Sequence, residues 1–163
     1  MTKPRAAAAK LTDLAAYRRA LGARTGGSHA YVTLLGLKTF DTESLLARVS
    51  AGFAYTTLER FRRNAHLTAH ELADLVQISP RTLVRRREEG RLSAEESDRL
   101  LRASRVCGRA LALFEGDADA TRAWLATPAP TLGGRTPLEA ARTEVDAREV
   151  EHLAGRLEHG VFS

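Results

Sequence analysis

The amino-acid sequence predicts an all-α protein, and three observations support this fold class. Residues 68–71, 93–96 and 136–139 each place a Ser or Thr three residues before a Glu, which is the capping-box pattern of a helix N-terminus. Apolar residues behind these boxes recur at i, i+3 and i+4, the spacing of one helix face. No segment alternates apolar and polar residues over the length that a β-strand needs.

Charge is distributed unevenly along the 163 residues. Lys and Arg total 25 against 20 Asp and Glu, which gives a net charge of +5. Residues 1–110 carry 20 basic and 11 acidic side chains, a net +9, whereas residues 111–163 carry 5 and 9, a net −4. A basic surface is attracted to phosphate and an acidic surface is repelled by it, so the asymmetry indicates two surfaces with different partners. Chance clustering on a single domain is the alternative interpretation.

Simple features of the sequence exclude several classes of protein. The apolar runs fall far short of the roughly 18 residues that a membrane span needs, and none matches the apolar region of a secretory signal. We therefore expect a cytoplasmic protein with no membrane partner. Cys107 is the only cysteine, which excludes an internal disulfide and a zinc site built from several thiolates.

The first expected helices precede the strongest motif in the sequence. Residues 11–21 have helical character before a Gly-rich break. Asp41 is a suitable N-cap for a helix that Gly52 ends, and residues 55–65 follow as another helix with its arginines on the outer face.

The strongest local signal is a pair of short helices joined by a tight turn. The capping box at Thr68 begins a helix over residues 69–77, and the proline after the turn stops it. Ser79 and Pro80 are then the N-cap and the first residue of a second helix, which ends at Gly90. Two helices with this spacing have the dimensions of a helix-turn-helix.

The same kinds of signal place the remaining helices. Ser93 begins a long helix that reaches about residue 114, and Asp117 or Asp119 caps a short helix behind it. The third capping box and the apolar series that follows it predict a last helical segment, which Gly160 ends.

The second helix of the motif is the expected DNA-recognition helix, because in a helix-turn-helix this element lies in the major groove. We expect Leu83 and Val84 to anchor it to the core. Arg pairs with guanine, and Thr contacts a base or a phosphate. The DNA-binding candidates are Arg81, Thr82, Arg85, Arg86, Arg87 and Arg91. A helical hairpin whose arginines are merely solvated is the alternative.

No arrangement of residues predicts a catalytic, metal or cofactor site. His66 and His70 are four residues apart, but a helix is expected to begin between them, and the Glu spacing of a zinc protease is missing. Gly133 and Gly134 precede a helix without the lysine of a phosphate-binding loop. Cys107 lies in an apolar helical series and is expected in the core. We therefore expect a protein that binds partners and is not an enzyme.

Two parts of the chain, in this order, resemble a known family. Residues 72–86 and 90–101 look like the helix-turn-helix of the Xre-type antitoxins from bacterial RES–Xre toxin–antitoxin pairs. The continuation resembles the C-terminal toxin-binding domain of that family, in residues 113–117, 123–125, 132–138 and 157–162. The resemblance covers roughly residues 31–163 and leaves the first 30 residues without a counterpart.

The resemblance implies an Xre-like helix-turn-helix domain at residues 31–108 and a small helical toxin-binding domain at residues 109–163, after an N-terminal extension of residues 1–30. Such an antitoxin neutralises a RES-domain toxin, an enzyme that depletes NAD or ADP-ribosylates a target, by blocking its active site with the C-terminal tail. By position, the toxin-binding candidates are Trp124, Leu157, His159, Gly160, Val161, Phe162 and Ser163.

The family also implies autoregulation through double-stranded promoter DNA of its own operon. We expect a homodimer within a larger hetero-oligomer, because palindromic operators pair two recognition helices. The apolar tail suits insertion into a concave partner, although it could instead fold back on the last helix. The alternative function is a stand-alone helix-turn-helix transcriptional regulator with a C-terminal dimerisation domain. A small nucleic-acid-modifying enzyme is disfavoured, because no acid–base constellation is present.

Overall fold

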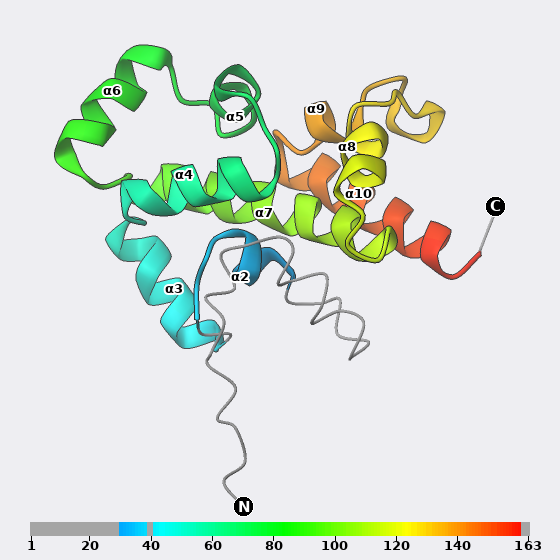
Figure 1. Cartoon of the computed structure of the whole chain (residues 1–163), viewed down its shortest axis with the longest axis horizontal. Coiled ribbons are helices and arrows are strands. Elements are labelled where there is room, and N and C mark those ends of the chain that lie inside the picture. Colours follow the sequence, from blue (N-terminus) through cyan, green and yellow to red (C-terminus); the bar gives the residue numbers. More distant parts are fainter. Residues whose placement is uncertain (1–29, 39–40, 161–163) are drawn as a thin grey trace, which may run out of the picture.

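The computed structural model describes residues 30–38 and 41–160, and in that part its regular elements are helices joined by turns and loops (Figure 1). The helix expected at residues 11–21 and the tail residues Val161, Phe162 and Ser163 lie outside the described residues. The elements in chain order are α2 (Ala30–Leu34), α3 (Thr42–Ala51), α4 (Tyr55–Asn64), α5 (Ala69–Leu75), α6 (Pro80–Glu89), α7 (Ala94–Leu113), α8 (Ala118–Leu125), the 3-10 turn η2 (Pro130–Leu132), α9 (Pro137–Ala140) and α10 (Glu144–Glu158). The all-α class is confirmed. None of these described helices is long and apolar enough to cross a membrane.

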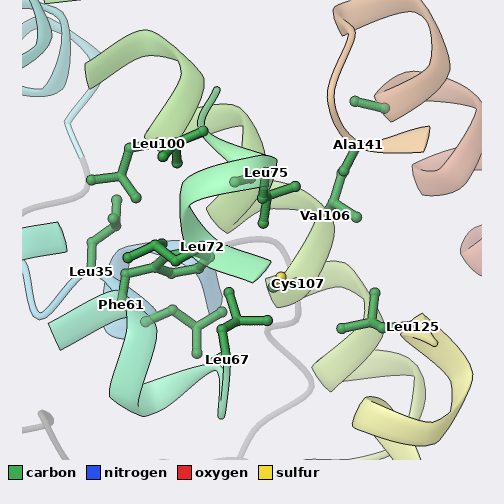
Figure 2. Packing of buried hydrophobic residues seen from close by; sticks show 14 of the residues in the cluster. Leu35, Phe61, Leu67, Leu72, Leu75, Leu100, Val106, Cys107, Leu125 and Ala141 are labelled. Carbon is green, nitrogen blue, oxygen red and sulfur yellow. The ribbon is translucent and has the colours of Figure 1, made fainter. Parts of the chain in front are cut away.

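The long helix α7 is the axis of the molecule. It packs against α2 and α3, which precede it in the chain, and against α8 and α10, which follow it (Figure 1). Leu100, Val106 and Cys107 of this helix are buried in one apolar cluster. In Figure 2, Phe61 and Leu72 lie on the same side of the cluster as Leu35, and Val106 lies towards Ala141. The expected boundary between residues 108 and 109 falls inside α7, so both halves of the protein share this helix.

The helix starts follow the local chemistry of the sequence. All three capping boxes form: the side chains of Thr68, Ser93 and Thr136 each accept a hydrogen bond from a backbone N–H, and the paired Glu accepts one in return. Asp117 caps α8 by accepting from the N–H groups of Asp119 and Ala120. These caps satisfy backbone donors that would otherwise lack partners at each helix start.

The last helical segment contains a break that the apolar series did not indicate. The helix α9 has four residues, and α10 begins at Glu144 after a turn. Thr143 is the N-cap of α10 and accepts from the N–H of Asp146 at 3.2 Å. Thr143 with Asp146 is itself a capping pattern, so the signal was present but lay inside a segment assigned to one apolar series.

A short antiparallel contact joins the start of α4 to the end of α6. Ala54 and Arg91 form a β-bridge, and Leu92 donates its N–H to the carbonyl oxygen of Phe53 at 2.9 Å. Gly52 has φ +84, and a Cβ added there would overlap the carbonyl oxygen of Leu92. This close approach requires glycine at position 52, because any larger residue would push the two segments apart.

Candidate functional site

The helix-turn-helix has the geometry that the sequence indicated. Its two helices, α5 and α6, are separated by the turn at residues 76–79, in which Gln77 has φ 54. Ser79 caps α6 by accepting from the N–H of Thr82, Pro80 is the first helical residue, and Gly90 ends the helix in the left-handed conformation. In Figure 1, α6 stands at one end of the long axis of the molecule, and the C-terminal end of α10 is at the other.

The helix α6 presents nearly all of its side chains to solvent. It contains no buried residue, and the side chains of Arg81, Arg85 and Arg87 are exposed. Leu83 packs partly buried against the core, as expected. The expectation for Val84 is wrong, because this side chain is 59% exposed. The side of α6 that faces the rest of the protein carries Leu83 and, three residues later, Arg86. Val84 projects away from that side and therefore does not reach the core.

Two of the candidate arginines also hold the motif together. The guanidinium of Arg86 donates to Glu96 at 2.7 and 3.0 Å and to Glu89 at 2.7 Å, and these hydrogen bonds raise the pKa of Arg86. Arg91 donates from Nη1 to the carbonyl oxygens of Ala51 at 3.1 Å and Gly52 at 2.8 Å. In the unbound chain both side chains therefore link the recognition helix and its exit to neighbouring elements.

Exposed positive charge is spread along α6, with Arg81 near its start and Arg85 and Arg87 in its second half. Glu89 pairs with Arg86 and lies 3.8 Å from the Nε of Arg85. Arg81 and Arg87 are exposed on the same helix. A nucleic-acid backbone approaching the start of α6 would meet the guanidinium group of Arg81 and the positive end of the helix dipole.

The C-terminal half is held to α7 by a row of ion pairs. Arg105 of α7 donates to Glu144 at 2.9 Å and to Glu151 at 3.0 Å, and Arg109 of α7 lies 2.7 Å from Glu158. Desolvation raises the pKa of Glu144, but the hydrogen bonds from Arg105 and Arg148 outweigh it, and the net pKa is lowered. Several of the C-terminal glutamates are therefore paired with arginines of the same chain. Part of the negative charge of residues 111–163 is thus neutralised within the protein.

The toxin-binding candidates that the structure describes come from two helices. Trp124 of α8 is half-buried, and its ring centroid lies 6.3 Å from that of Phe114. Leu157 is half-buried on α10, whereas His159 and Gly160 are exposed at the end of that helix. His159 lines a shallow groove together with Arg109, Glu151, His152, Gly155 and Arg156. The residues that follow α10 thus begin beside this groove between α7 and α10.

Sequence reasoning missed a second junction, between α5 and the C-terminal half. Arg122 of α8 pairs with Glu71 of α5, and Gln77 donates its side-chain amide to the carbonyl oxygen of Arg142 at 3.0 Å. The capping box identified Glu71 as a cap, but its second partner is 51 residues away and has no local signal. A cleft lined by His70, Asp74 and Glu139, among others, opens at this junction.

The cysteine and the two histidines considered as chemical candidates lie at positions that serve the fold. Cys107 is buried, and its burial raises the pKa of the thiol to about 12. His66 has φ 55 and follows the end of α4, whereas His70 lies in the first turn of α5. Within residues 30–38 and 41–160, no group of three or more His, Cys, Asp or Glu side chains is placed to hold a metal ion.

Comparison with protein families matches both halves of this arrangement. The antitoxin Xre-like helix-turn-helix domain matches residues 44–105, and the antitoxin Xre/MbcA/ParS C-terminal toxin-binding domain matches residues 109–160. The antitoxin Xre of Yersinia enterocolitica is 38% identical over 130 residues, which cover 79% of this chain and 88% of the relative. The chain belongs to the Xre antitoxin family.

Other relatives show how far the likeness extends. The antitoxin Xre of Pseudomonas putida is 32% identical over 143 residues, which cover 84% of this chain and 88% of the relative. A protein of a Sphingobium species named Prs ADP-ribosylating antitoxin is 25% identical over 124 residues, covering 71% and 78% of the two chains. The two family matches meet within α7, the helix shared by both halves.

Proposed function

We infer that this protein is the antitoxin of a type II toxin–antitoxin pair, which neutralises a RES-domain toxin with its C-terminal region and binds the promoter DNA of its own operon. The observation that carries this inference is the presence, in one chain, of an Xre-like helix-turn-helix followed by a toxin-binding domain. The protein acts by binding and not by catalysis, in keeping with relatives that are named antitoxins.

The DNA-binding surface comprises the exposed part of α6 and its flanks. Arg81 and Thr82 lie in the first turn of the helix, from which recognition helices contact base edges, and Arg85 lies one turn further along. Arg87 is placed for phosphate contact, whereas Arg86 and Arg91 hold the helix in position through their contacts within the chain. A homodimer would present two such helices to a palindromic operator.

The toxin-binding surface comprises the toxin-binding domain, residues 109–163, and above all the chain beyond α10. His159 and Gly160 are exposed, and Val161, Phe162 and Ser163 follow them in sequence. An apolar aromatic side chain at a chain end is suited to fill a concave site on a partner. The partner we propose is a RES-domain toxin that consumes NAD or ADP-ribosylates a target, and the name of the Sphingobium relative refers to such a reaction. The expected compartment is the cytoplasm.

Two variants separate the proposed activities. Deletion of residues 159–163 leaves every residue of α10 in place, and we expect it to abolish protection of cells that co-express the adjacent toxin gene while promoter binding is retained. The double charge reversal Arg81→Glu with Arg85→Glu is the matched control, with promoter binding lost and protection retained when expression comes from an unrelated promoter.

The outcomes of this experiment are distinct. If the truncated protein still protects the cells, the tail does not block the toxin. If the adjacent gene product is not toxic and does not co-purify with the full chain, the stand-alone transcriptional regulator with a C-terminal dimerisation domain becomes the better description. If neither the full chain nor its complex with the toxin binds the promoter fragment, the autoregulatory part of the proposal is wrong.

A further inference from the structure

An apolar side chain stands in the middle of the charged outer face of α6. Val84 is 59% exposed, and it is the fifth residue of this helix. Arg81 lies three residues before Val84 and four before Arg85, so it is the surface neighbour of both, and the three side chains lie on the same side of the helix. Single exposed apolar residues are ordinary on protein surfaces, and Val84 becomes informative only through its position among these arginines.

The rotation of α6 about its own axis is fixed, and this directs Val84 outward. Leu83 packs against the core, and Arg86 is held by two hydrogen bonds to Glu96, whose side chain is only 10% exposed. These two residues are three apart and mark the inner side of the helix. A rotation that buried Val84 would break the contacts of Arg86 with the start of α7. Val84 is therefore held in solvent in the unbound chain.

The two arginines on this side of α6, Arg81 and Arg85, favour nucleic acid over protein as the partner of this face. A protein that covered Val84 would also have to desolvate the guanidinium groups of Arg81 and Arg85, at a large cost in free energy unless each met a matched carboxylate. A DNA major groove offers phosphates and guanine acceptors for the arginines. It also displays one apolar group beside them, the C5-methyl group of thymine.

We propose that Val84 contacts the C5-methyl group of a thymine when α6 lies in the major groove, so that this residue contributes to the sequence specificity of the protein. This inference rests on the proposed DNA-binding function and deepens it. The arginines on the same face contact guanines or phosphates, and Val84 adds recognition of an A·T pair adjacent to them. The operator is thus expected to contain, in each half-site, a thymine next to the bases that the arginines contact.

Replacement of thymine by uracil in the DNA tests this contact directly, because uracil differs from thymine only by the missing methyl group. The probe is the DNA fragment upstream of the operon, prepared once with thymine and once with uracil throughout. Binding is measured with the full chain, alone and co-purified with the toxin. We expect wild-type binding to be weaker on uracil DNA by about fourfold for each methyl group contacted, the factor that burial of one such group provides.

The variant Val84→Ala removes the contact from the protein side. It is expected to bind thymine DNA more weakly than wild type and to lose the preference for thymine over uracil, while the salt dependence of binding stays unchanged because the phosphate contacts remain. Val145→Ala is the matched control: Val145 is 75% exposed on α10, outside the recognition helix, and its variant should keep the wild-type preference.

Each result either supports the inference or rejects it. If wild type binds both fragments equally, or if Val84→Ala keeps the full preference for thymine, Val84 does not contact a thymine methyl, although the DNA-binding function itself stands. If no form of the protein binds the thymine fragment, the inference fails together with the proposed function. Loss of toxin neutralisation in Val84→Ala, with DNA binding intact, would identify Val84 as a protein contact instead.

Discussion

The carboxylate of Glu96 accepts two hydrogen bonds from the guanidinium of Arg86, at 2.7 and 3.0 Å, and so joins α6 to the first turn of α7. The same carboxylate accepts from the backbone N–H of Ser93 at 2.8 Å and completes the capping box of α7. One acidic side chain thus begins the long central helix and orients the recognition helix. Burial opposes its charge, but the bonds from Arg86 and Ser93 outweigh burial, and the net pKa of Glu96 is lowered.

We predict that Glu96→Gln lowers the free energy of unfolding by about 1.5–3 kcal/mol, the range for losing hydrogen bonds to a charged group. The amide keeps one acceptor for the capping box but leaves the guanidinium of Arg86, whose side chain is 18% exposed, without its anionic partner on α7 and with only Glu89 of its own helix. Promoter affinity should also fall, since α6 loses its fixed orientation. Chemical denaturation and promoter-binding titrations are the measurements.

Glu95→Gln is the matched control for this variant. Glu95 also pairs with an arginine, Arg99, but its side chain is 78% exposed, and exposed pairs contribute little. The control should change stability by less than about 0.5 kcal/mol. Equal effects of the two substitutions would mean that the bridge from α6 to α7 has no special part in stability.

The sequence predicted well those features that depend on neighbours within one helical turn. The capping boxes at Thr68, Ser93 and Thr136 involve only residues three apart, so their chemistry is readable from the chain alone. Val84 was misassigned because its apolar character suggested burial, whereas the inner side of α6 is occupied by Arg86 through a partner on another helix. Local pattern cannot supply that partner.

The same distinction between local and long-range contacts applies to the candidate site. The position of the recognition helix followed from local spacing, but Arg105 of α7 is 39 and 46 residues from its two glutamate partners on α10. Such pairs depend on how two helices pack, and a net charge of −4 for residues 111–163 does not reveal them. The roles of the individual DNA- and toxin-binding candidates, with residues 161–163 outside the described part, stay predictions.

Gly52 and Gly90 offer a prediction on backbone conformation, because both have positive φ but differ in surroundings. A Cβ on Gly52 would overlap the carbonyl oxygen of Leu92, whereas a Cβ on Gly90 would have no atom within 4 Å. Gly52→Ala should therefore lower the free energy of unfolding by at least about 3 kcal/mol, and Gly90→Ala by only about 1–2 kcal/mol from left-handed strain. Denaturant titrations of both variants test the difference, and similar values would reject the role of the close approach.

Asp146 and Arg135 offer a prediction on pH dependence. Hydrogen bonds from Arg135, at 2.8 and 2.9 Å, and then from Thr143 lower the pKa of Asp146 from 3.8 to about 2. Because the folded-state pKa lies below the unfolded value, the pair stabilises the fold above pH 3.8, and this contribution is lost as the pH falls from 3.8 towards 2.

A double-mutant cycle of Asp146→Asn and Arg135→Gln measures this contribution without interference from other groups. The coupling between the two side chains should be constant from neutral pH down to about 5 and should decrease steadily below 3.8. A coupling that stays constant down to pH 3 would contradict the assignment of the lowered pKa to this pair.

The ion pairs between α7 and α10 lead to a prediction on local stability. Arg105→Glu would place a third carboxylate between Glu144 and Glu151, which now lie 2.9 and 3.0 Å from the guanidinium. We expect a loss of about 1–3 kcal/mol, less than for a fully buried pair because the Arg105 side chain is 31% exposed. Amide hydrogen exchange should accelerate in α10 and remain slow in the middle of α7, since the loss acts on the docking of the last helix.

Arg148→Glu is the control for the prediction on α10, because Arg148 also pairs with Glu144, at 3.1 Å, but lies on α10 itself and is 68% exposed. It introduces the same charge change without touching the junction with α7, so exchange in α10 should stay close to wild type. Toxin neutralisation should weaken in Arg105→Glu and not in Arg148→Glu, because a tail on a poorly docked helix is presented to the toxin with less preorganisation. Unchanged exchange in the Arg105 variant would show that apolar packing alone docks α10 on α7.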